Sequence, residues 1–146
     1  PRMVITADGI GYEAHALTWP ESKGSPVLFG ADRVITTAAE KAKIAQSFEA
    51  SVVDMESHTV ARAAKEKGIS FSVIRAVADG CTQALPPSTE GAVREDGSVN
   101  TLQTLGKLLR RPFDLPELIA VGQQAAKGTK TLRAHAPALL SGLARH

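Results

Sequence analysis

Two acidic residues stand at the ends of short apolar segments in this chain. Glu56 follows residues 51–55, which include two adjacent valines, and Asp79 comes soon after the apolar run 69–74. Short runs of this kind are typical of strands, and in open α/β sheets ligands bind beyond the carboxyl ends of the strands. Two carboxyl groups at such an edge can divide acid–base work between a proton donor and a stabilising anion. The structural alternative for Asp79 is a residue that caps a turn.

A helix and a second strand are predicted to position these two carboxyl groups. From Ser57, small and apolar residues repeat at i, i+3, i+4 and i+7, charged residues take the other face, and Gly68 is a stop signal. Residues 69–74 are β-branched and aromatic and predict a strand. Together with residues 51–55 they form a right-handed βαβ unit, which places Glu56 and Asp79 at one edge of a sheet.

The residues before this unit predict three more strands. Residues 2–6 form the first, residues 7–9 are a turn signal, and residues 12–17 are its hairpin partner. Residues 26–30 form the next strand.

One further helix is predicted between these strands and the βαβ unit. Thr36 or Thr37 caps it, and it runs to Phe48. Lys41 and Lys43 fall on the face that is predicted to point into water.

The residues after Asp79 predict a loop and a helical tail. Residues 80–100 form a long irregular loop, and loops of that length often bind ligands. Leucines at helical spacing follow in residues 102–109, and a new helix begins around Pro116. Gly128 is predicted to separate a last segment, in which Pro137 either kinks the helix or starts a fresh turn.

Several of these residues resemble a known signature. The run 54–57, with Asp79 placed 23 positions after Glu56, resembles the nucleoside phosphorylase and nucleosidase superfamily. Residues 53–58 and 84–87 look most like the hopanoid-associated phosphorylases of that superfamily. The resemblance implies an α/β fold, three-layer αβα with a mixed central sheet.

The resemblance also implies roles for individual residues. Asp79 corresponds to the acid at purine N7, and because an ordinary aspartate with a pKa of about 3.9 is ionised at neutral pH, the site or the substrate must raise that pKa. Glu56 corresponds to the carboxylate that binds the ribose 2′- and 3′-hydroxyls, and Met55 to a methionine packed on the ribose. Val34 and Ile35 stand where the family has a Phe-Ile pair that brackets the base, so aromatic stacking is lost and backbone recognition at Ile35 is kept.

Four other residues of the motif region have more than one interpretation. Ala78 lies in the substrate site by resemblance, where many nucleosidases have serine. Arg75 is either an ion-pair partner of one of the carboxylates, which we favour, or a ligand contact. His58 is expected to be packed or solvated rather than catalytic, and Cys81 to be a small buried residue or a bystander. No histidine spacing indicates a metal site.

Length, charge and cysteine content limit the kinds of protein that this chain can be. The chain has 146 residues, enough for one domain, and a net charge of +2, which does not indicate nucleic-acid binding. Residues 107–146 hold 7 basic and 2 acidic residues, a charge of +5. A single cysteine and the lack of an 18-residue apolar run predict a cytoplasmic protein. Because the family pattern starts late and Pro1 opens the chain, residues 1–146 are expected to be the C-terminal portion of one phosphorylase-like domain.

The function implied is cleavage of the N-glycosidic bond of an adenine nucleoside, without a cofactor and with phosphate or water as acceptor. The subfamily resemblance implies conversion of adenosylhopane to ribosylhopane and adenine in hopanoid biosynthesis, by a homo-oligomer whose basic tail contacts membranes peripherally. One alternative is a nucleosidase for small nucleosides such as methylthioadenosine. The other is a non-catalytic fragment or purine-nucleoside-binding module.

Overall fold

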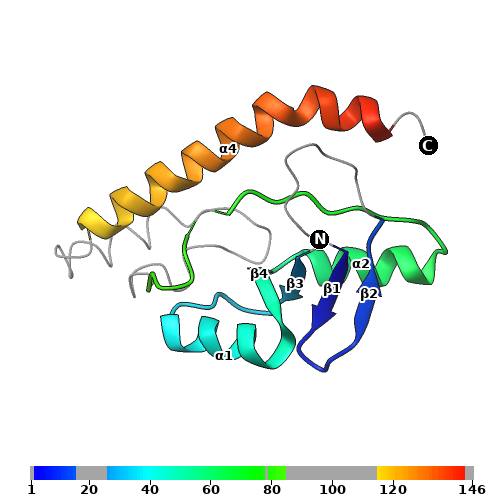
Figure 1. The fold of residues 1–146 in the computed structure, drawn as a ribbon, viewed down its shortest axis with the longest axis horizontal. Coiled ribbons are helices and arrows are strands. Elements are labelled where there is room, and N and C mark those ends of the chain that lie inside the picture. The colour runs from blue at the N-terminus through cyan, green and yellow to red at the C-terminus, as the bar shows by residue number, and fades with distance from the viewer. Residues whose placement is uncertain (1, 16–25, 78, 85–114, 144–146) are drawn as a thin grey trace.

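Figure 1 shows the computed structural model of the chain, which describes residues 2–15, 26–77, 79–84 and 115–143. Four strands form one sheet in the order β2-β1-β3-β4. β1 runs antiparallel to β2 and parallel to β3, which is in turn parallel to β4. The mixed sheet that we expected is therefore confirmed. The strands are β1 (Met3–Thr6), β2 (Gly11–Glu13), β3 (Val27–Gly30) and β4 (Ala50–Asp54).

Two helices cover opposite faces of this sheet. Ile44 of α1 (Ala38–Phe48) packs with Phe29 in one apolar cluster. Ala61 of α2 (Ser57–Glu66) packs with Val4 and Leu28 in a second cluster. Successive side chains of a strand point to opposite faces of the sheet, so Leu28 packs against α2 and Phe29 packs against α1. The result is the three-layer αβα arrangement that we predicted.

The ends of both helices follow from local sequence, as predicted. The Thr37 side chain caps α1 by accepting a hydrogen bond of 3.2 Å from the Glu40 backbone N–H. Glu49 ends that helix in the left-handed conformation, with φ of 52°. Gly68 follows α2 with φ of 63°, a conformation that glycine adopts without strain. β4 starts and ends one residue earlier than predicted, so that Met55 lies just beyond it.

The predicted strand at residues 69–74 is not formed. The segment is extended but joins no ladder of the described sheet. Phe71 accepts a bond of 2.8 Å from the His15 N–H beyond β2, and Phe71 and Val73 pack on the cluster that contains Ala61. The segment then reaches β4, where Arg75 pairs with Asp54. Phe71 and Val73 are half-buried on that cluster, whereas Ile69 and Ile74 are exposed. The segment therefore packs through two of its apolar side chains, and its backbone has no parallel neighbour in the described sheet.

The part of the tail that the structure describes is one helix, α4 (Leu115–Leu143), which runs without a break through Gly128. The predicted separation at Gly128 is therefore wrong. A helix tolerates one glycine at a cost of about 1 kcal/mol when its neighbours favour helix. Figure 1 shows the green segment of residues 69–84 passing between α4 and the sheet. Gly128 makes a close approach there, since a Cβ added to it would lie 3.2 Å from the Ala76 Cβ. Pro137 lies inside the helix. The predicted loop beyond residue 84 and the predicted leucine segment at residues 102–109 lie outside the described residues.

Candidate active site

The parallel strands bring several sequence motifs to one edge of the sheet. Thr6, Gly30 and Asp54 are partners across β1, β3 and β4, so all three strands end at the same edge. Residues 34–35 follow β3 on the way to α1, and residues 55–56 follow β4 on the way to α2. The predicted substrate residues on these two connections therefore leave the sheet on the same side, where ligands bind in open α/β folds.

Asp54 organises this edge. Its carboxylate is 10% exposed and accepts hydrogen bonds from the Ser57 N–H, at 3.0 Å, and from the Ser57 hydroxyl. Its Oδ2 also lies 2.5 Å from Nε of Arg75. Sequence reasoning did not single out Asp54, although an aspartate three residues before the first backbone N–H of a helix is a recognisable capping pattern. Asp54 therefore connects the end of β4 to the start of α2 and to the segment of residues 69–77, which we call the crossing segment.

Arg75 connects Asp54 to Glu56. Its Nη2 donates to Oε2 of Glu56 at 3.3 Å and to the Ser57 hydroxyl at 3.1 Å. The ion-pair interpretation of Arg75 is thus confirmed. The Glu56 side chain is 62% exposed at the start of α2, so its carboxylate can accept further hydrogen bonds.

Asp79 is held by an unexpected partner. Its Oδ2 forms an ion pair with Nζ of Lys41 in α1. The same ammonium donates to the backbone carbonyls of Gly80, at 3.2 Å, and Gln83, at 2.9 Å. The Lys41 side chain is only 11% exposed, so the prediction that it faces water is wrong. Helical periodicity identifies the face of Lys41 but not the turn at residues 79–83 that covers it.

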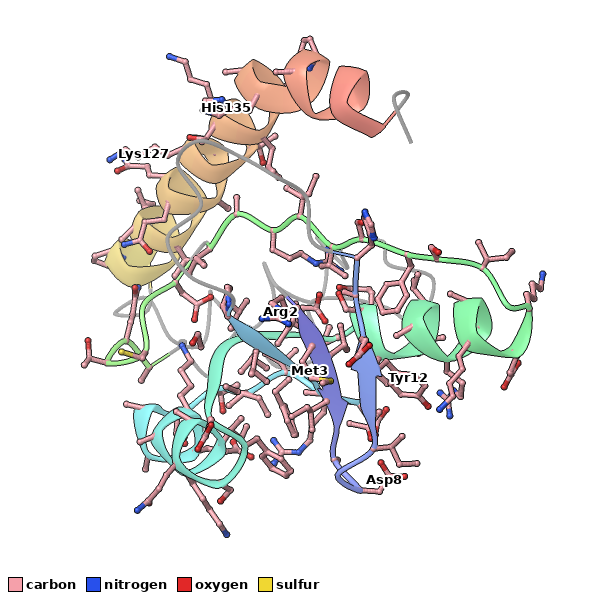
Figure 2. The ribbon with its side chains drawn as sticks, turned by 45° about the vertical axis from the view of Figure 1, so that its right-hand side comes forward. Arg2, Met3, Asp8, Tyr12, Lys127 and His135 are labelled. Atoms are coloured by element: carbon pink, nitrogen blue, oxygen red, sulfur yellow. The ribbon has the colours of Figure 1, made fainter. Side chains whose placement is uncertain are left out.

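Asp79 also borders an open cavity of about 520 Å³. The wall opposite consists of Gln124, Lys127 and Thr131 of α4, of which Lys127 is labelled in Figure 2. The cavity has both apolar and hydrogen-bonding groups, as small-molecule sites do. It places the tail helix beside the predicted acid.

Val34, Ile35 and Met55 follow β3 and β4 at this edge. Ile35 is buried in the α1 cluster, while Val34 and Met55 are half-buried. The Val34 carbonyl accepts a bond of 3.4 Å from Arg33. Ala78 lies outside the described residues.

The structure gives His58 a packed role and leaves Cys81 exposed. His58 is buried against Gly30, and its Nε2 lies 3.0 Å from Oδ1 of Asp32, which fits the packed role. Cys81 is exposed, which corrects the buried interpretation and leaves that of a bystander. Within the described ranges, no three His, Cys, Asp or Glu side chains gather as a metal ion would require.

These features define an α/β protein in which Glu56, at the carboxyl edge of the sheet, is paired with Arg75, and Asp79 is paired with Lys41 of α1. The family model of the Phosphorylase superfamily matches residues 2–110. The chain therefore belongs to the phosphorylase superfamily, the nucleoside phosphorylase and nucleosidase family that its motifs resemble. The comparisons with curated proteins and with solved structures found no match. None of the helices described is both long enough and apolar enough to span a membrane.

Proposed function

We propose that this protein acts in cleaving the N-glycosidic bond of an adenine nucleoside, with phosphate or water as the acceptor. In this proposal Asp79 protonates the leaving base and Glu56 binds the ribose. The observation that carries it is that each carboxylate is anchored by its own cation, Glu56 by Arg75 and Asp79 by Lys41.

The chemistry requires two acidic groups with different tasks. As the bond from C1′ to N9 breaks, its electron pair moves onto the purine, and a proton delivered to N7 neutralises the leaving base. A positioned general acid contributes about 10²–10⁴-fold to such a step. Positive charge grows on the sugar at the same time, and a carboxylate nearby stabilises it more in the transition state than in the ground state.

Glu56 suits the second task. Arg75 contacts its Oε2, and the exposure of the side chain leaves the carboxylate open to hydroxyl donors. Its place at the start of α2 is fixed through Asp54, so that the carboxylate stands on a rigid element. The proposal assigns Met55 to the ribose, the Val34 side chain and Ile35 backbone to the base, and Ala78 to the purine surroundings.

Adenosylhopane is the proposed natural substrate. The sequence of residues 53–58, which resembles that of the hopanoid-associated phosphorylases, supports this substrate. The cavity between Asp79 and α4 leaves space for it beside the acid. Apolar burial of about 0.8 kcal/mol per methylene predicts that kcat/KM rises several-fold with each of the first methylenes in a 5′-alkyl adenosine series. A flat or falling series, with methylthioadenosine as the best substrate, would favour the small-nucleoside alternative.

The proposal also includes a peripheral membrane contact by α4. Lys127, Lys130 and Arg133 are exposed on this helix, and each basic group near an anionic surface contributes about 1 kcal/mol. Sedimentation with vesicles containing phosphatidylserine should decrease when the three are replaced by Gln. Equal sedimentation of the variant and the parent would remove the membrane contact and leave the enzymatic proposal untouched.

Adenine release decides between an enzyme and a nucleoside-binding module. We expect Asp79→Asn to lower kcat on adenosine by about 10²–10⁴-fold, while a nucleoside whose base leaves without protonation is affected far less. Asp8→Asn, at the exposed tip of the β1–β2 hairpin, is the matched control. Binding of nucleoside without adenine release by the parent protein would support the binding module instead.

A further inference from the structure

We infer that Lys41 is a positioning residue for the reaction, which orients the carboxyl group of Asp79 and fixes the turn that carries it. The inference rests on the proposed role of Asp79 as the acid, and it adds a residue that the sequence motif does not contain.

The contacts of Lys41 use the full capacity of its ammonium group. A lysine ammonium has three N–H donors. In this structure it faces three acceptors, namely Oδ2 of Asp79 and the carbonyls of Gly80 and Gln83. The Gln83 N–H in turn donates to the Gly80 carbonyl at 3.2 Å, which closes the turn. One cation thus holds a whole turn rather than one carboxylate.

Lys41 itself stands on a helix that is packed on the core. Lys41 lies in the first half of α1, and its own N–H bonds to the Thr37 carbonyl at 3.1 Å. Three residues further along, Ile44 is buried in the apolar cluster beneath the helix. Asp79 is 38 positions away in sequence and follows the crossing segment, which pairs with no strand of the described sheet. Lys41 therefore connects the turn at residues 79–83 to a helix that is packed on the core.

The pairing also distinguishes the two oxygens of Asp79. Lys41 occupies Oδ2, so Oδ1 is the oxygen left to carry the proton. In the step proposed, the O–H bond at Oδ1 breaks, the N–H bond at purine N7 forms, and the bond from C1′ to N9 breaks with its electron pair moving to the base. Asp79 becomes a carboxylate as this happens, and the contact of Lys41 at Oδ2 keeps Oδ1 oriented towards the base during the transfer. Lys41 should therefore affect kcat more than KM.

The test compares Lys41→Met, Lys41→Arg and Lys43→Gln. Lys43 is exposed on the same helix and is the matched control. We expect Lys41→Met to lower kcat on adenosine by about 10- to 100-fold with KM changed by less than about twofold, since misplacement of a catalytic group by about 1 Å costs up to about 10²-fold. Lys41→Arg should give an intermediate kcat, and Lys43→Gln should behave as the parent.

A double variant shows whether Lys41 acts through Asp79. In the Asp79→Asn background, Lys41→Met should lower kcat by less than about twofold further, because the residue that it positions is already lost. A nucleoside whose base leaves without protonation should likewise be nearly insensitive to Lys41→Met. Equal slowing of that nucleoside and of adenosine would overturn the inference and leave only a structural salt bridge.

The outcomes for Lys41 and for the proposed function are separable. If Asp79→Asn retains the parent's turnover, the acid role fails whatever Lys41 does. If Asp79→Asn loses turnover while Lys41→Met matches Lys43→Gln, only the inference about Lys41 fails. Should Lys41→Met not fold, a parent-like kcat in Lys41→Arg would also overturn the inference.

Amide hydrogen exchange gives a readout that does not depend on activity. We expect the Gln83 amide to exchange at least tenfold faster in Lys41→Met than in Lys43→Gln, while the Ile44 amide in α1 exchanges as in the parent. Unchanged exchange at Gln83 would mean that Lys41 does not hold the turn.

Discussion

Arg75 places its Nε 2.5 Å from Oδ2 of Asp54, at the end of β4, and so ties the crossing segment to the sheet. The pair is partly screened, because the Arg75 side chain is 37% exposed while that of Asp54 is buried. Breaking a buried pair by removing one partner is costly, since the remaining charge loses its compensation.

Replacement of Asp54 by Ala should destabilise the protein by about 2 kcal/mol, below the about 3–5 kcal/mol typical of a fully buried pair, because solvent reaches Arg75. Asp54→Asn, which keeps an oxygen for the Ser57 N–H, should cost less. Urea unfolding measures both, with Glu66→Gln, at an exposed position near the end of α2, as the control. An Asp54→Ala variant as stable as the control would show that the pair contributes nothing to stability.

Gly30 should not tolerate a side chain. A Cβ there would collide with the Cβ of His58 and lie 2.6 Å from its Nδ1. Gly30→Ala is therefore expected to cost about 1–3 kcal/mol of stability or more, as overpacking of a core does. In a His58→Gly background, which removes the Cβ that the new methyl group would strike, the same substitution should cost much less relative to that background. Gly80→Ala, which meets no atom within 4 Å, is the control, and additive effects in the double variant would contradict this explanation.

Glu56→Gln should lower kcat and raise KM together. The amide keeps hydrogen bonding to the ribose hydroxyls but loses the negative charge that opposes the charge growing on the sugar. Glu66→Gln, in the last turn of the same helix, should leave both constants as in the parent. Steady-state kinetics on adenosine separates these effects, and a rise in KM alone would restrict Glu56 to ground-state binding.

Asp8 should titrate below the ordinary value of 3.8. The hydrogen bond from the Thr6 hydroxyl lowers the pKa of the Asp8 carboxyl, which lies at the tip of the β1–β2 hairpin (Figure 2). Because the folded-state pKa is the lower one, the stability that this bond adds is present above pH 3.8 and is lost as pH falls through the lowered pKa. NMR titration of the carboxyl group measures it. Thr6→Val should return the pKa towards 3.8, and an unchanged titration would assign the shift to another cause.

The sequence by itself determined the features whose causes lie within a few residues. Thr37 caps α1 because its hydroxyl reaches a backbone N–H three residues on, and Gly68 follows α2 because glycine adopts positive φ without strain. The run 54–57 with Asp79 indicated the superfamily, since a signature is read from residue types and spacing alone.

Only the tertiary structure decided which distant groups meet. Residues 69–74 have the composition of a strand, yet they cross a face of the sheet because Phe71 and Val73 find apolar contacts there. Lys41 has the periodicity of a solvent-facing residue, yet a turn 38 positions later brings Asp79 to it. Periodicity reports which face of an element a residue occupies. What covers that face depends on the path of the rest of the chain, and that path is set by burial and pairing over the whole fold.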